Sequence, residues 1–203
     1  MRQHFRQHLR LVIWSLAAVT LALSLVVQVT ARDVQQSGEK QSDGLHFMWE
    51  FYPKSFREAR DKAPLIVLAD VIAVERGPDV VVPVKGIPND EDRVPMQYVT
   101  ARVTKSYRGA AAAGQTVTLA QTGGGNIGFS EDDPAYQVGE RYVLLLQPGR
   151  PNMYRIISPE GRYRITGRGL VEPMRVANPN SPALAGLRGG KPLEVLEQLI
   201  ALP

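Results

Sequence analysis

The sequence predicts a mainly β domain of about six strands, a small barrel or sandwich with one short helix before the strands and one after them. Two observations carry this prediction. Apolar and polar residues alternate in several short stretches, which is the period of a half-buried strand. Turns rich in glycine or proline separate these stretches. The chain has 203 residues and no internal repeat.

An uncharged apolar segment, residues 11–29, precedes that domain and predicts an N-terminal hydrophobic helix. The only charges before Arg32 are three arginines within the first ten residues, which favours a cytoplasmic N-terminus. The segment is long enough to cross a bilayer of ~30 Å, and small or short residues near Ala31 fit a cleavage site. Two alternatives stay open: a signal peptide cleaved after Ala31, or an uncleaved membrane anchor at 11–29. Both place the rest of the chain outside the cytoplasm, secreted or anchored to the cytoplasmic membrane.

The segment that follows is polar, and residues 32–46 read as a flexible linker. Residues 47–52 form an aromatic cluster, for which we expect packing into the core; contact with a membrane surface is the alternative. Residues 54–62 contain strong helix formers and predict a short helix that ends before Pro64.

Four stretches then predict strands: residues 65–75, 97–107, 115–121 and 141–147. We expect the first strand to end at Gly77-Pro78, because this pair favours a turn. The fourth is nearly all apolar, so we expect it to be buried on both faces.

The last part of the domain predicts a hairpin and a final helix. Residues 152–157 and 162–166 read as its two strands around a turn at 158–161. After Pro173 the chain is rich in Pro, Asn and Gly, and residues 192–200 form a short amphipathic helix. The expected organisation is therefore 1–31 for targeting, 32–46 for the linker, 47–173 for the β domain and 174–203 for the tail.

The net charge of +4 and the pI near 9.5 suggest a nucleic-acid partner at first sight. Three of the 24 basic residues lie in the targeting segment, and the other 21 face all 20 acidic residues. The exported part is therefore near neutral and lacks the basic excess that phosphate backbones require. We expect no nucleic-acid binding.

Cysteine is absent, so disulfides, thiolate nucleophiles and cysteine-ligated metals are excluded. His4 and His8 precede the apolar segment, which leaves His46 as the one histidine of the exported part. A single histidine in a linker cannot form a His₂ or His₃ metal site, and a Ser-His-Asp triad is close to excluded. No motif places a serine beside a lysine for a Ser-Lys dyad.

Two acidic clusters are the remaining candidates for chemistry: Asp90, Glu91 and Asp92, and Glu131, Asp132 and Asp133. Neither follows the spaced pattern of a calcium-binding loop, so we expect solvated loops. A pair of carboxylates drawn from both clusters could serve as acid and base in glycoside hydrolysis, but the spacing does not favour it.

The stretch at 122–128 is rich in glycine and resembles a phosphate-binding loop. It lacks the Gly-Lys-Ser/Thr ending, and the acidic residues that follow would repel phosphate. We expect a glycine-rich turn between strands.

Several of these segments together resemble a known domain. They are residues 65–71, 103–109, 114–119, 123–125, 136–146 and 161–165. In this order they resemble bacterial exported proteins, mostly of unknown function, whose domain is similar to the OB-like barrel of tissue inhibitors of metalloproteinases and netrin modules. The resemblance covers roughly residues 56–172 and implies an OB-like barrel. The animal inhibitors use an N-terminal cysteine and disulfides that this chain lacks, so the resemblance implies the fold without that mechanism and carries over no functional residue.

We therefore expect an exported, non-enzymatic binding or interaction module on the outer side of the cytoplasmic membrane. Its ligand would be an unknown protein or cell-envelope component, bound by loops at 76–96 and 123–137. The sequence predicts no catalytic, cofactor-binding or metal-ligating residue and no cofactor. The alternatives are an extracytoplasmic hydrolase that uses loop carboxylates and, by analogy of fold alone, a protease inhibitor.

Overall fold

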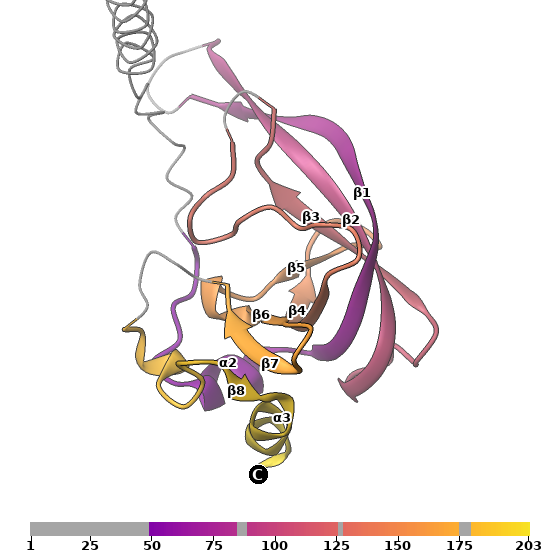
Figure 1. Ribbon diagram of the computed structural model, residues 1–203. Coiled ribbons are helices and arrows are strands. Elements are labelled where there is room, and N and C mark those ends of the chain that lie inside the picture. The colour runs from indigo at the N-terminus through magenta and orange to yellow at the C-terminus, as the bar shows by residue number, and fades with distance from the viewer. Residues whose placement is uncertain (1–48, 85–88, 126–127, 175–179) are drawn as a thin grey trace, which may run out of the picture. The chain divides into compact units, whose positions relative to one another are not determined.

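The computed structural model describes residues 49–84, 89–125, 128–174 and 180–203 (Figure 1). The described part is mainly β, with a single eight-stranded sheet and two α-helices, which confirms the predicted class. The strands are β1 (Leu65–Pro83), β2 (Glu91–Arg108), β3 (Thr116–Thr122), β4 (Arg141–Pro148), β5 (Tyr154–Ile156), β6 (Arg162–Ile165), β7 (Leu170–Pro173) and β8 (Lys191–Pro192). The helices are α2 (Phe56–Lys62) and α3 (Leu193–Ala201), with short 3-10 turns at η1 (Pro159–Gly161) and η2 (Pro182–Leu184).

Both predicted helices are confirmed. Helix α2 begins after Ser55, whose hydroxyl oxygen accepts a hydrogen bond from the backbone N–H of Glu58 at 3.1 Å. It ends at Ala63, directly before Pro64. Helix α3 buries Leu196 and Ile200 on one face.

The first strand of the sheet pairs with two other strands. The order is β1-β2-β3-β5-β4-β6-β7-β8, and β1 pairs with β4 as well. All of these pairs are antiparallel except β3 with β5, which is parallel. Five strands, β1 to β5, are thus linked in a closed series of pairings.

The predicted end of the first strand at Gly77-Pro78 is wrong. Strand β1 continues to Pro83 and pairs with β2 along its whole length (Figure 1). The register shifts between Gly77 and Val80, so Pro78 lies at a bulge, where a missing N–H is tolerated.

The predicted hairpin of 152–157 with 162–166 is also wrong in its pairing. Strands β5 and β6 both pair with β4: Leu146 is opposite Ile156, and Leu144 is opposite Arg162. The chain between β5 and β6, residues 157–161, does not continue the pairing with β4 and includes η1. These residues lie opposite a single residue of β4.

The first part of β1, residues 65–69, and most of β4 are apolar on both faces because they separate two core clusters. Leu65, Val67 and Ala69 contribute to one cluster together with Leu144 of β4. Ile66 on the opposite face belongs to the second cluster, in which α2 and α3 also bury their apolar residues. The burial expected for β4 on both faces is therefore confirmed.

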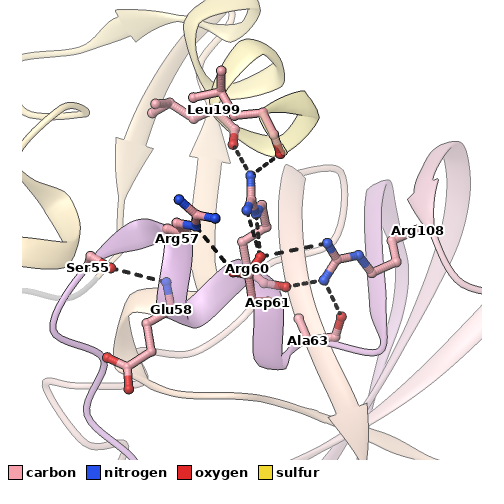
Figure 2. A network of polar contacts seen from close by, with 9 residues as sticks. Ser55, Arg57, Glu58, Arg60, Asp61, Ala63, Arg108 and Leu199 are labelled. Carbon is pink, nitrogen blue, oxygen red and sulfur yellow. Dashed lines mark hydrogen bonds and ion pairs between the residues drawn. The ribbon is translucent and has the colours of Figure 1, made fainter.

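Two arginines donate hydrogen bonds to backbone carbonyls at the C-terminal ends of the two helices, as Figure 2 shows. Arg60 of α2 is 3% exposed and donates to the backbone carbonyls of Leu199, at 3.2 Å, and Leu202. Arg108 of β2 donates to the carbonyls of Arg60 and, at 3.4 Å, Ala63. The last carbonyls of a helix have no partner within it and form the negative end of its dipole. These contacts attach α3 to α2, and α2 to the sheet.

Within the described ranges, no helix combines the length and the apolar character that a membrane crossing needs. The predicted targeting segment, with its hydrophobic stretch at 11–29 and the cleavage site after Ala31, lies outside the described residues. So do the predicted linker at 32–46 and the first two residues of the aromatic cluster.

Candidate functional site

A cavity of about 180 Å³ lies beside the end of β3, where this strand diverges from β5. The two strands share a single register pair, Leu119 with Tyr154. The volume is close to the ~150 Å³ that can hold one benzene ring. The cavity therefore fits a group with the size of one ring or one side chain.

Separate parts of the chain supply the polar lining. Trp49 comes from the segment before α2, Gln121 from β3 and Arg155 from β5. Asp133 and Tyr136 come from the loop between β3 and β4. The site therefore forms only when the sheet has assembled and that loop has closed over it.

Three polar atoms of these residues have no hydrogen-bond partner within the described structure: Trp49 Nε1, Gln121 Oε1 and the hydroxyl oxygen of Tyr136. Gln121 and Tyr136 are only 2% and 4% exposed. A buried polar group without a partner costs about 1–3 kcal/mol. All three atoms are buried and belong to side chains that line the same cavity.

The amide group of Gln121 has a structural role as well. Its nitrogen Nε2 donates to the backbone carbonyls of Asp133 at 2.9 Å and Pro134 at 3.0 Å. Both bonds fasten the loop to β3. The donors of this side chain are thus occupied, and its oxygen has no partner within the described structure.

Arg162, the first residue of β6, holds the same loop from the other side. It is 1% exposed, and its guanidinium donates to the carbonyls of Ala135, at 3.1 Å, and Pro134. It also donates to the hydroxyl oxygen of Tyr142 at 3.0 Å. The rigid, forked guanidinium suits this arrangement, which a lysine could not reproduce.

The charge of Arg162 is balanced on two sides. Nη1 lies 3.2 Å from Oδ1 of Asp133. The guanidinium carbon lies 3.4 Å from the ring centroid of Tyr136, which is a cation–π contact. Arg162 therefore holds Asp133 and Tyr136, which form one wall of the cavity, in place.

Burial governs the ionisation of these groups. It raises the pKa of Asp133 to about 6, even though Arg162 favours the charged form. It also raises the pKa of Tyr136 above its usual range. The hydroxyl of Tyr136 is consequently neutral at physiological pH and able to donate or accept a hydrogen bond.

The structure separates the two predicted acidic clusters into different settings. Asp90, Glu91 and Asp92 are exposed at the tip of the hairpin between β1 and β2. Of the second cluster, Asp133 alone lines the cavity, where it pairs with Arg162. Across the described ranges there is no group of three or more Asp, Glu or His side chains that could hold a metal ion.

The glycine-rich stretch begins where β3 ends. Gly123, Gly124 and Gly125 all have positive φ angles, and the N–H of Gly123 donates to the carbonyl of Pro95 at 2.9 Å. At Gly123 an added Cβ would lie 2.7 Å from the carbonyl oxygen of Gly128, so the turn requires glycine there. This agrees with the predicted turn between strands.

The aromatic cluster divides between the site and the core. Trp49 lines the cavity and packs against one core cluster, and Phe51 packs against the other. Core packing is thus confirmed for these two residues. Sequence reasoning did not single out Gln121, Tyr136 or Arg162, because none of them belongs to a motif.

Comparison with known proteins adds no further indication of function: no protein family matches the chain, and no curated protein matches it in sequence.

Proposed function

We propose that this chain is an exported, non-enzymatic binding module that acts on the outer side of the cytoplasmic membrane. Its ligand-binding site is the cavity lined by Trp49, Gln121 and Tyr136. The observation that carries the proposal is the set of three unpartnered polar atoms at one ring-sized cavity.

The chemical nature of these atoms favours recognition over catalysis. The indole N–H of Trp49 only donates a hydrogen bond, and the amide oxygen of Gln121 only accepts one. The phenol of Tyr136 does both, and its raised pKa makes it a poor proton donor to a reaction. A ligand group that carries both an acceptor and a donor, such as a primary amide or a ring hydroxyl, would complement the site.

We further propose that β1 to β5 form an OB-like barrel. The closed series of pairings through β1, β2, β3, β5 and β4 supports this arrangement, as does the parallel pair of β3 with β5. The cavity would then lie at the place where the barrel is least completely paired.

Saturation-transfer NMR on the full-length protein in detergent tests the binding proposal. The probes are a panel of monosaccharides and N-acetylated amino acid amides. We expect at least one to bind, and we expect Tyr136→Phe and Trp49→Phe each to weaken its binding about five-fold, which corresponds to ~1 kcal/mol for one lost hydrogen bond.

Tyr163→Phe is the matched control. The hydroxyl of Tyr163 is also buried without a hydrogen-bond partner within the described structure, but Tyr163 belongs to the other core cluster and does not line the cavity. This variant should bind as the wild type does. The proposal fails if no probe binds, or if Tyr163→Phe weakens binding as much as Tyr136→Phe.

Export has its own test. Sequencing the N-terminus of the mature protein distinguishes a start at Arg32, which means cleavage, from an intact N-terminus, which means an anchor. Recovery of the protein in the cytoplasmic fraction would overturn the proposed location.

A further inference from the structure

The direction of the peptide groups in β3 is fixed by hydrogen bonds at its two ends. Directly before the strand, the carbonyl of Gln115 accepts a hydrogen bond from the N–H of Val103 in β2, at 2.8 Å. Directly after it, the N–H of Gly123 donates to the carbonyl of Pro95 at 2.9 Å. The odd-numbered residues of this stretch therefore direct their peptide groups toward β2.

Peptide groups alternate in direction along a strand, so those of Ala120 and Thr122 face away from β2. On that side the described residues give β3 one partner, β5, and the pairing between them is limited to Leu119 with Tyr154. A parallel pair of this kind engages the carbonyl of Thr118 and the N–H of Ala120, so the carbonyl of Ala120 and both peptide groups of Thr122 have no strand partner among the described residues. Backbone groups at an unpaired strand edge can pair with an added strand.

The cavity lies along this edge on the face of Gln121, whose side chain points into the core. The other face of the edge borders a second hollow of about 400 Å³, which also includes Ala120 and Thr122. Its apolar wall is formed by Val82 and Met96 together with Val80, Val94 and Pro148. Side chains of an added strand alternate between two faces, and here each face has a hollow to receive them.

Among the described residues, the second hollow has two charged lining residues, Arg150 and Arg155, and both are positive. Arg155 pairs with Glu50 at 2.7 Å, whereas the contact shown by Arg150 is a long hydrogen bond of 3.4 Å to the hydroxyl of Tyr98. A carboxylate on the ligand would complement Arg150.

We infer that the partner is an extended, acidic peptide segment that adds as a strand to the edge of β3 at Ala120–Thr122. An amide side chain of the peptide enters the cavity, where it bonds with Trp49 Nε1 and Gln121 Oε1. An adjacent apolar side chain enters the second hollow, and a carboxylate pairs with Arg150. This inference rests on the proposed binding function and names its partner class.

An array of synthetic peptides of about eight residues tests the inference with the full-length protein. Each peptide carries a central glutamine or asparagine next to an apolar and an acidic residue, and scrambled sequences serve as controls. For the tightest peptide, N-methylation at one set of alternate positions should weaken binding at least ten-fold, because strand addition needs those N–H groups. N-methylation of the intervening positions should change binding less than about two-fold.

A protein variant provides the second measurement. Arg150→Ala should weaken the peptide about five-fold or more, since it removes a charge-assisted bond. It should leave the binding of a simple amide in the cavity unchanged. The binding measurements do not report whether Arg150→Ala is folded. Thermal unfolding of this variant checks that it is.

The outcomes separate the two proposals. If amide or sugar probes bind and no peptide does, or if N-methylation acts equally at all positions, strand addition is refuted and the binding function stands. If neither the small probes nor the peptides bind, both proposals fall.

Discussion

The ion pair behind the cavity makes a sharp prediction about pH. Asp133 is 13% exposed at its side chain and lies 3.2 Å from Arg162, yet burial raises its pKa to about 6. A raised pKa means that the folded state favours the protonated carboxyl. We therefore expect the stability of the wild type to fall, relative to Asp133→Asn, as the pH rises from about 4 to above 6.

The size of this effect follows from the two pKa values. The ordinary value for aspartate is 3.8, and the folded value is about 6. One pKa unit corresponds to ~1.4 kcal/mol, so ionisation of Asp133 lowers the free energy of unfolding by about 3 kcal/mol. Below about pH 4 the carboxyl is protonated in both states, and this loss is absent. The asparagine variant does not titrate here, so its contribution is the same at every pH.

Urea unfolding followed by circular dichroism between about pH 3 and 7.5 measures the difference between the two proteins. Asp61→Asn is the control with the opposite sign, because a hydrogen bond from Arg60 lowers the pKa of the Asp61 carboxyl. There the wild type should lose stability relative to the variant as the pH falls below about 4, the ordinary range of an aspartate pKa. A wild-type stability that rises with pH relative to Asp133→Asn would show that Arg162 outweighs burial, and would refute the reasoning.

Two further predictions concern the fold. Arg60→Met should lower the free energy of unfolding by about 2 kcal/mol, because the carbonyls of Leu199, in α3, and of Leu202, directly after it, lose a charged donor. Urea unfolding measures this loss. Arg57→Ala removes an exposed ion pair and should cost less than about 0.5 kcal/mol. Gly109→Ala should destabilise more than Gly114→Ala in thermal unfolding. Both glycines have positive φ angles, but only at Gly109 would a Cβ meet backbone, 2.7 Å from the carbonyl oxygen of Pro64. Equal effects within either pair of variants would contradict the assigned contacts.

The parts of the fold that the sequence predicted are those that local physics decides. The alternation of Val99, Ala101 and Val103 with polar residues marks β2, and these three residues are buried. Pro64 marks the end of α2, because the steric effect of proline on the preceding residue acts locally. Such signals need no knowledge of which strands pair.

The predictions that failed depended on distant partners. Gly77-Pro78 usually ends a strand, but β2 lies alongside and pairs on both sides of it. A bulge accommodates the proline, and the long hairpin continues. Pairing with β2 thus outweighed the preference of Gly77-Pro78 for a turn.

The proposed binding site could not be predicted for a related reason, which Arg162 illustrates. Ile156 pairs with Leu146, and Arg162 pairs with Leu144, so the chain between them, 157–161, opposes a single residue of β4. Cross-strand partners share a face of the sheet. This detour therefore directs Arg162 to the buried face of Leu144, where it fixes the loop that walls the cavity. A sequence pattern treats 158–161 as an ordinary turn, and a charged residue after a turn is normally expected in solvent. Only the register with β4 reveals that this arginine is structural and that the cavity in front of it is preformed.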